Sequence, residues 1–246
     1  MLGPVLARTR DLVRSYRWRW LDPAHNVEAI DIPALISPLR YDIVAIRDFL
    51  RLFLERRELA RSDFGRFLEQ ARQHRYYQWI AAHYRRFFPE ESRNPQAHTT
   101  RIARKIRQTI DIWDALEGGF DRRFPIEIRV TSRLLPTETG KRVSLRYILG
   151  DGSHRLACLM VQGMTELPGD FYRLRWYRRH RPFDATWALT SQGQLPEGEY
   201  FAFLSEVYGA PEDCRDRISF MLFIQRALPE REAEVRTILR VDGFPV

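Results

Sequence analysis

Hydrophobic side chains recur every three or four residues through much of the first 120 positions, which is the spacing of amphipathic helices. This pattern predicts three long helices. They cover residues 43–57, residues 63–86 after a Ser62 cap, and a segment that starts at Thr99 or Thr100 and ends at Gly118 and Gly119. The stretch 89–96, before the third helix, is expected to be a loop.

The first twenty residues mix arginine with aromatic residues. Four of their apolar side chains could share one helical face: Leu6, Leu12, Val13 and Trp20. This favours a helix packed on the domain, and contact with a membrane surface or nucleic acid is the alternative. Three prolines then interrupt residues 21–42, which predicts loops and a short extended piece around Ala29 to Ile32.

Beyond residue 120 the hydrophobic period becomes two, which is the spacing of strands. Strands are predicted over 124–130, 142–149 and 170–179, with a turn at 131–141 because that stretch holds Pro136 and Gly140. A helix is expected from Ser153 to about Gly163. Further helices are expected over about 198–208, 212–228 and 230–240.

These elements predict a single α+β domain over residues 1–246. Residues 1–120 form its mainly helical N-terminal part, residues 121–180 its sheet-containing core, and residues 181–246 its helical C-terminal part. The sequence contains no internal repeat and no low-complexity tract.

Composition narrows the possible ligands of the protein and its possible cellular locations. The 246 residues carry a net charge of +8, and 38 of the 40 basic residues are arginine, which suits phosphate and carboxylate ligands. A GC-rich genome would give the same bias. No apolar run approaches the roughly 20 residues of a membrane span, and arginines occupy the place of a signal peptide's apolar stretch. Two cysteines cannot form a disulfide framework, so we expect a cytoplasmic protein.

The segment 147–163 carries the strongest chemical signal. A strand runs into Asp151 and Gly152, and a helix then starts with Ser153, His154 and Arg155. Free N–H groups at a helix start attract anions, and glycine lets a ligand approach the backbone closely. Arginine can pair with phosphate oxygens, and the aspartate can hold Mg²⁺ or orient the histidine. The segment therefore predicts a phosphate site with a metal ligand at Asp151.

This strand–DGSHR–helix motif resembles the ParB/sulfiredoxin superfamily, and the resemblance spans roughly residues 124–178. The matching positions are Asp151, Gly152, His154, Arg155, Ala157 and Gly163. Sulfiredoxins place a catalytic cysteine where this chain has Ser153, so their chemistry is not expected here. ParB proteins carry a helix-turn-helix that is not recognisable after residue 180. The motif is most similar to that of the free serine kinases.

The resemblance also implies an upstream segment that supplies acidic residues. The candidate is residues 30–42, in which Asp42 is the first choice as catalytic acid or base and Arg40 as a substrate ligand. Asp31, Glu28 and Glu127 are rivals. The simpler interpretation of Asp42 is a helix cap or a surface salt bridge.

The kinase resemblance implies a nucleotide-dependent phosphotransferase that uses ATP or ADP with Mg²⁺ and acts on a hydroxyl group of a small molecule. Asp42, Asp151 and His154 would be catalytic. The nucleotide would bind residues Gly152 to Arg155. The alternatives are a CTP- or ATP-switching nucleic-acid-binding module, and a protein that keeps the fold without catalysis and serves a partner.

The remaining features of the sequence are weaker evidence for a function. The six histidines lack metal-ligand spacing, and there is no Walker loop or G-x-S-x-G. Cys158 is expected to be a small buried residue rather than a nucleophile. The arginine-rich run 174–183 could contact phosphates, or it could be the solvated face of an edge strand.

Overall fold

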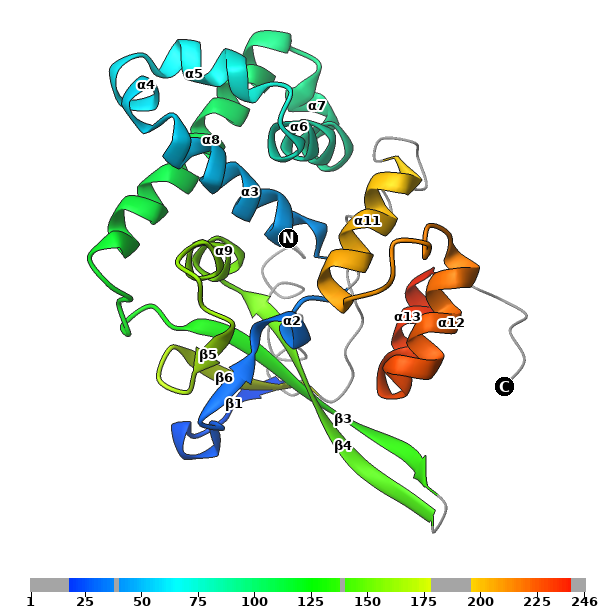
Figure 1. Cartoon of the computed structure of the whole chain (residues 1–246). Helices are drawn as coiled ribbons and strands as arrows, with labels where there is room; N and C mark the ends of the chain where they lie inside the picture. Colours follow the sequence, from blue (N-terminus) through cyan, green and yellow to red (C-terminus); the bar gives the residue numbers. More distant parts are fainter. Residues whose placement is uncertain (1–17, 38–39, 138–139, 178–195, 240–246) are drawn as a thin grey trace, which may run out of the picture. The chain divides into compact units, whose positions relative to one another are not determined.

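The computed structural model describes residues 18–37, 40–137, 140–177 and 196–239 (Figure 1). It confirms a mixed α+β protein. The chain divides into two compact units, each built from three separate segments. The first unit comprises Met1–Ser37, Asp121–Gly152 and Thr165–Pro182, and the second comprises Pro38–Phe120, Ser153–Met164 and Phe183–Val246. This division cuts across the three parts expected from the sequence, and the ParB-like character of the fold remains a prediction.

The first unit is built on a four-stranded sheet in the order β1-β6-β3-β4. Its strands are β1 (Trp18–Trp20), β3 (Ile126–Thr137), β4 (Gly140–Asp151) and β6 (Tyr172–Tyr177). β3 pairs antiparallel with β4 and parallel with β6, whereas β1 pairs antiparallel with β6. Figure 1 shows β3 and β4 as a long twisted hairpin.

Side-chain alternation explains how this sheet forms a core. Ile126, Ile128 and Val130 are buried along β3, and their partners Tyr172 and Leu174 on β6 are buried too. β-Branched and aromatic residues at every second position fit a half-buried pleated surface. Charged residues fill the intervening positions, as the alternation predicts.

A smaller two-stranded sheet completes the first unit. It pairs β2 (Ala29–Asp31) with β5 (Glu166–Pro168), near the short helices η1 (Pro23–His25) and α2 (Ile32–Leu35). The short extended piece predicted around Ala29 is therefore confirmed, whereas β5 was not expected. Asn26 ties the loop down, because its amide donates to the carbonyls of Gly169 and Tyr172 at 2.6 and 3.1 Å.

The second unit consists of helices. They are α3 (Tyr41–Glu55), α4 (Arg57–Ser62), α5 (Phe64–Ala71), α6 (Arg75–Phe87), α7 (Pro89–Ser92), α8 (Pro95–Glu117), α9 (Ser153–Val161), α11 (Glu197–Tyr208), α12 (Arg217–Ala227), η2 (Pro229–Arg231) and α13 (Glu232–Leu239). Helix α3 is buried on nearly all sides from Tyr41 to Ile46, and α9 packs against it through Leu156 and its neighbours. A helix that is apolar around its circumference forms the centre of a core.

Aromatic rings fill the space between α3, α5 and α6. Phe49 is fully buried, and its ring centroid lies 5.2 Å from that of Tyr76 and 6.0 Å from that of Phe67. Edge-to-face and tilted contacts of this kind add to the energy of burial. They hold Tyr76 in place for the site described below.

Several predicted elements are wrong in detail. Residues 131–137 continue β3 instead of turning, and Pro136 pairs with Lys141 in the hairpin. Residues 63–86 form two helices rather than one, because the backbone turns at 72–74 and His74 caps α6 by accepting the N–H of Tyr76.

Two further boundaries differ. The third helix starts at Pro95, after an Asn94 cap that accepts the N–H groups of Gln96 and Ala97, and α7 occupies part of the expected loop. Trp18 to Trp20 form a strand rather than the end of a helix, and residues 1–17 lie outside the described residues. The arginine-rich residues 178–183 also lie outside them.

Across the described helices, none combines the length and apolar character needed to cross a membrane.

Candidate functional site

The strand–turn–helix junction predicted around residue 152 is present. β4 ends at Asp151, Gly152 adopts φ = 97°, and α9 begins at Ser153. This positive φ is strained for residues with a side chain, which explains why glycine stands here. The division of the chain falls inside the motif, so Asp151 and Gly152 belong to the first unit and Ser153, His154 and Arg155 to the second.

Asp151 is exposed and makes a local contact. Its Oδ1 accepts the N–H of Gly152 at 2.7 Å, which stabilises the turn. Across the hairpin it pairs with Glu127, at a point where the β3–β4 register shifts.

His154 lies in the first turn of α9 and contacts the helical core. Its Nε2 is 3.1 Å from the hydroxyl of Tyr76 on α6. That hydroxyl is 2.8 Å from Oγ1 of Thr109 on α8, and Thr109 donates to the carbonyl of Lys105 at 3.0 Å. Tyr76 and Thr109 are fully buried. Side chains from α6 and α8 therefore fix the position of the imidazole on α9.

Asp42 lies in the first turn of α3 and is also buried. Arg40 holds both of its oxygens: Nε donates to Oδ1 and Nη2 donates to Oδ2, each at 2.9 Å. This two-point pairing orients the carboxylate firmly. Asp42 forms a salt bridge, as the simpler interpretation expects, but it does not cap α3 and is buried rather than on the surface. A buried, oriented carboxylate is also what a catalytic acid requires.

The negative charge of Asp42 affects the pKa values of two other side chains of the second unit, Tyr76 and His83. Burial raises the pKa of Tyr76 well above its ordinary value, and the negative charge of Asp42 raises this pKa further. Burial also lowers the pKa of His83, while Asp42 opposes that effect. Asp42 therefore lies within electrostatic range of Tyr76, the residue that contacts His154. Two of the three predicted catalytic residues, Asp42 and His154, therefore belong to the second unit, and Tyr76 is the residue on which both act.

The rival acids have other roles. Asp31 caps α2 by accepting the N–H of Ala34 at 3.2 Å, and Glu28 is exposed. Glu127 accepts from Arg175 at 2.6 Å and from Arg129 at 3.2 Å within the sheet of the first unit. All three residues belong to the first unit.

Asp151 decides whether the residues around Gly152 suit a nucleotide with a bound metal ion. No cluster of three or more metal-ligating side chains occurs within the described ranges. Mg²⁺ commonly binds through one or two carboxylates, with phosphate oxygens and waters filling the other positions. Oδ1 of Asp151 accepts a backbone N–H and the residue is exposed, so this aspartate suits such an arrangement.

Three other residues named in the sequence analysis lie on α9. Cys158 is buried on α9, and burial raises the pKa of its thiol to about 12, which favours the protonated form. Ser153 and Arg155 are both partly exposed in the first turn of α9.

Tyr76 and Thr109 carry no sequence signal that marks them as site residues. Tyr76 stands in the run RYYQW at ordinary core spacing, and Thr109 lies in the middle of a long helix. Only the three-dimensional packing of α6, α8 and α9 brings them to His154.

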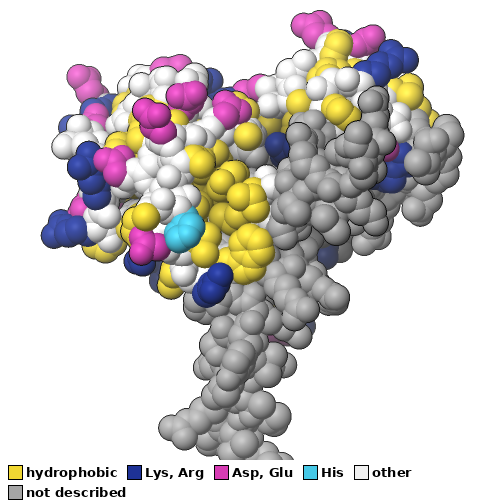
Figure 2. All heavy atoms as spheres, turned by 90° about the horizontal axis from the view of Figure 1, so that it is seen from below, with side chains coloured by type: hydrophobic (Ala, Val, Ile, Leu, Met, Phe, Trp, Pro, Cys, Tyr) yellow, Lys and Arg dark blue, Asp and Glu magenta, His cyan; other side chains and the backbone are white. Residues whose placement is uncertain are grey.

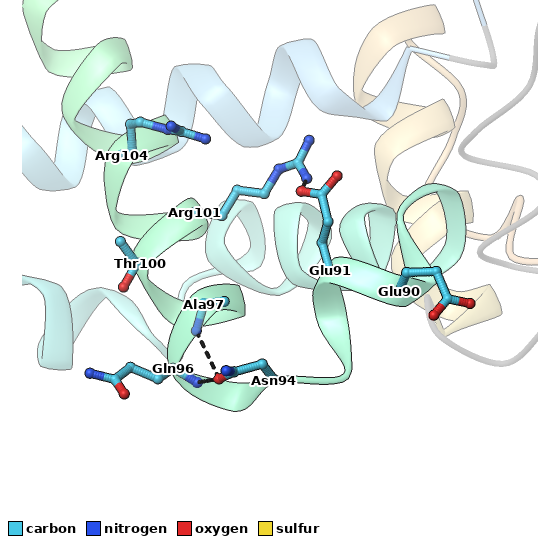
Figure 3. Close-up of a pocket in the computed structure, with 8 residues that line it drawn as sticks. All are labelled: Glu90, Glu91, Asn94, Gln96, Ala97, Thr100, Arg101 and Arg104. Atoms are coloured by element: carbon cyan, nitrogen blue, oxygen red, sulfur yellow. Dashed lines mark hydrogen bonds and ion pairs between the residues drawn. The ribbon is translucent and has the colours of Figure 1, made fainter.

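A shallow cavity of about 600 Å³ lies elsewhere in the second unit, between α7 and the start of α8 (Figure 3). Its lining contains none of the motif residues. Arg101 pairs with Glu91 and lies against the rings of Tyr84 and Phe88, at 4.5 and 4.1 Å from their centroids. Figure 3 shows the Asn94 side chain directed at the helix backbone. These groups are engaged with their neighbours, so the cavity adds no candidate to the site.

The chain matches no protein-family model, no curated protein and no solved structure.

Proposed function

We propose that this protein is a nucleotide-dependent phosphotransferase acting on a hydroxyl group of a small molecule. One observation carries the proposal: α9 starts directly after the positive-φ Gly152, and the histidine in its first turn is held by a buried network near the oriented carboxylate of Asp42. A helix start, an arginine, a fixed histidine and a buried acid are the parts that phosphoryl transfer uses.

Each residue has a proposed role. The backbone N–H groups of Ser153 and His154 and the guanidinium of Arg155 bind the phosphates of ATP or ADP. Asp151 holds Mg²⁺, which neutralises phosphate charge when bound. Arg40 binds the acceptor and orients Asp42.

In the transfer step, a bond forms between the acceptor oxygen and the terminal phosphorus. The bond from that phosphorus to the leaving nucleotide oxygen breaks, and the hydroxyl proton passes to Asp42. Transfer of this kind depends mainly on positioning and on charge neutralisation, which fits a site with few reactive groups.

The first experiment is a thermal-shift panel with ATP, ADP, CTP and GTP, each with and without Mg²⁺. A ligand at 100 times its Kd stabilises the folded protein by about 2.7 kcal/mol. We expect Mg²⁺-dependent stabilisation by an adenine nucleotide that is lost in Arg155→Ala. Arg93→Ala, an exposed arginine at the end of α7, is the matched control and should respond as the wild type does. No response to any nucleotide would remove the proposal.

A specific observation favours the second candidate, a CTP- or ATP-switching nucleic-acid-binding module without catalysis. Trp20 is 43% exposed, and the guanidinium carbons of Arg173 and Arg175 each lie 4.9 Å from its ring centroid. Exposed aromatic rings next to arginines bind single-stranded nucleic acids by stacking and by phosphate contacts. On the face drawn in Figure 2, however, described acidic and basic side chains are interspersed rather than gathered in one positive field.

Fluorescence anisotropy with a labelled single-stranded oligonucleotide tests this candidate. Its affinity should fall with salt by a logarithmic slope of about 0.7 per phosphate contact. Both Trp20→Ala and Arg173→Ala should weaken binding, whereas Arg93→Ala should not. Equal losses in the two arginine variants, with no loss in Trp20→Ala, would indicate attraction by net charge alone and would remove this candidate.

A further inference from the structure

The hydrogen bonds around His154 determine which ring nitrogen carries its proton. Three groups form a chain from the ring into the core: the Tyr76 hydroxyl, the Thr109 hydroxyl and the Lys105 carbonyl. A neutral histidine has one N–H and one acceptor nitrogen, and the partners of each nitrogen decide which is which.

The chain can be followed from its buried end. A carbonyl oxygen only accepts, so Thr109 must donate its one proton to Lys105. Thr109 then has no proton for Tyr76, and the 2.8 Å contact between their oxygens requires Tyr76 to donate. The Tyr76 hydroxyl has now donated its own only proton. At 3.1 Å from Nε2, its oxygen must therefore accept a proton from the ring.

We infer that Tyr76 and Thr109 fix neutral His154 as the tautomer protonated on Nε2. Tyr76 is thus a positioning residue, and Thr109 sets the direction in which it donates. Burial keeps Tyr76 protonated, since it raises the pKa of the phenol far above neutral pH. Full burial of Tyr76 and Thr109 also keeps solvent from reversing the chain.

This tautomer limits what the ring can do. Its N–H is directed to Tyr76, so the neutral ring has no N–H left for a phosphate oxygen. Any hydrogen bond that neutral His154 makes through Nδ1 is one that it accepts. In phosphoryl transfer, a role that rests on the function proposed above, neutral His154 would accept a hydrogen bond, Asp42 would receive the proton, and charge on the phosphates would be stabilised by Arg155.

The test is ¹⁵N NMR of the imidazole in the full chain without any nucleotide, with His154→Gln used to assign the resonances. In the wild type we expect Nε2 at the protonated position and Nδ1 at the unprotonated one. In Tyr76→Phe, which keeps the ring but removes the hydroxyl, this preference should be lost. Tyr77→Phe, at the neighbouring position of α6, is the matched control and should leave the spectrum unchanged.

Thr109→Val provides the sharper test. Without the threonine oxygen, Tyr76 can donate to Nε2, so the tautomer should switch to the form protonated on Nδ1. A wild-type ring protonated on Nδ1, or a Thr109→Val spectrum identical to the wild type, would overturn the inference. Because no nucleotide is present, failure of the phosphotransferase proposal would leave these spectra unaffected.

Discussion

The two units differ in their net charge. The segments of the first unit carry 17 of the 40 basic residues and 10 of the 32 acidic residues, a net charge of +7. Those of the second carry 23 basic and 22 acidic residues, a net charge of +1. The first unit holds arginines on a sheet, whereas the second pairs its charges around an aromatic core.

This difference separates two sources of function. Excess positive charge attracts polyanions over a distance without selecting among them. A hydrogen-bonded network such as His154, Tyr76 and Thr109 offers little net charge but fixes individual protons and oxygens. The features that would recognise a phosphate in detail therefore lie mainly in the unit that carries almost no net charge.

The largest expected effect tests whether the aromatic core of the second unit contributes more to the free energy of unfolding than an exposed ring of the first unit. Phe49→Ala should cost about 3–5 kcal/mol, because it removes a fully buried ring that contacts Phe67 and Tyr76. Phe124→Ala in the first unit, where the ring is 65% exposed, should change stability by no more than about 0.5 kcal/mol. Urea unfolding measures both, and similar costs for the two variants would contradict the assignment of the aromatic core.

A smaller effect tests the charges inside the sheet. Glu127→Gln should cost about 1.5–3 kcal/mol, the range for hydrogen bonds to charged groups, because the side chain is only 12% exposed and accepts from Arg175 and Arg129. Glu90→Gln breaks an ion pair with Arg93 that is about three-quarters exposed, and should cost less than about 1 kcal/mol. If both variants unfold at the same urea concentration, Glu127 does not organise the sheet.

The smallest effect is one of pH in the second unit. Burial lowers the pKa of His74 and His83 below the value of 6.5 for an unperturbed histidine. Below pH 6.5 the unfolded chain binds protons that the folded chain does not, so these residues make stability fall as the pH falls. Thermal melts at about pH 7.5 and 5.5 should show this drop, and His83→Gln should reduce it. A drop of equal size in the variant would argue against His83 as a source.

Much of the fold follows from local patterns, while its boundaries depend on tertiary pairing. Alternation placed the strands near 124, 142 and 170, because buried isoleucines and exposed charges leave a clear period of two. Pro136 and Gly140 indicated a turn too early, since an extended hairpin tolerates proline at positions where no N–H is needed. The start of α8 could have been predicted from the sequence, because asparagine followed by proline is a common helix beginning.

The candidate site was predicted only in part. Gly152 and the start of α9 follow from a strand, a glycine and a serine in sequence, because serine is common at helix starts. Asp42 and His154 lie 112 residues apart, and only a resemblance suggested pairing them. Tyr76 and Thr109 could not have been chosen, because a tyrosine and a threonine at core spacing satisfy the same pattern whether or not they bond to a histidine.

The segments of the two units alternate along the chain, and this order has a consequence for biosynthesis. Trp20 on β1 pairs with Arg175 on β6, 155 residues further along the chain. At a synthesis rate of about 5–20 residues per second, β1 leaves the ribosome roughly 8–30 s before its partner strand exists. The helices between them can form within microseconds. On the ribosome, the helical segment 40–117 can therefore be organised while the sheet of the first unit still lacks a strand.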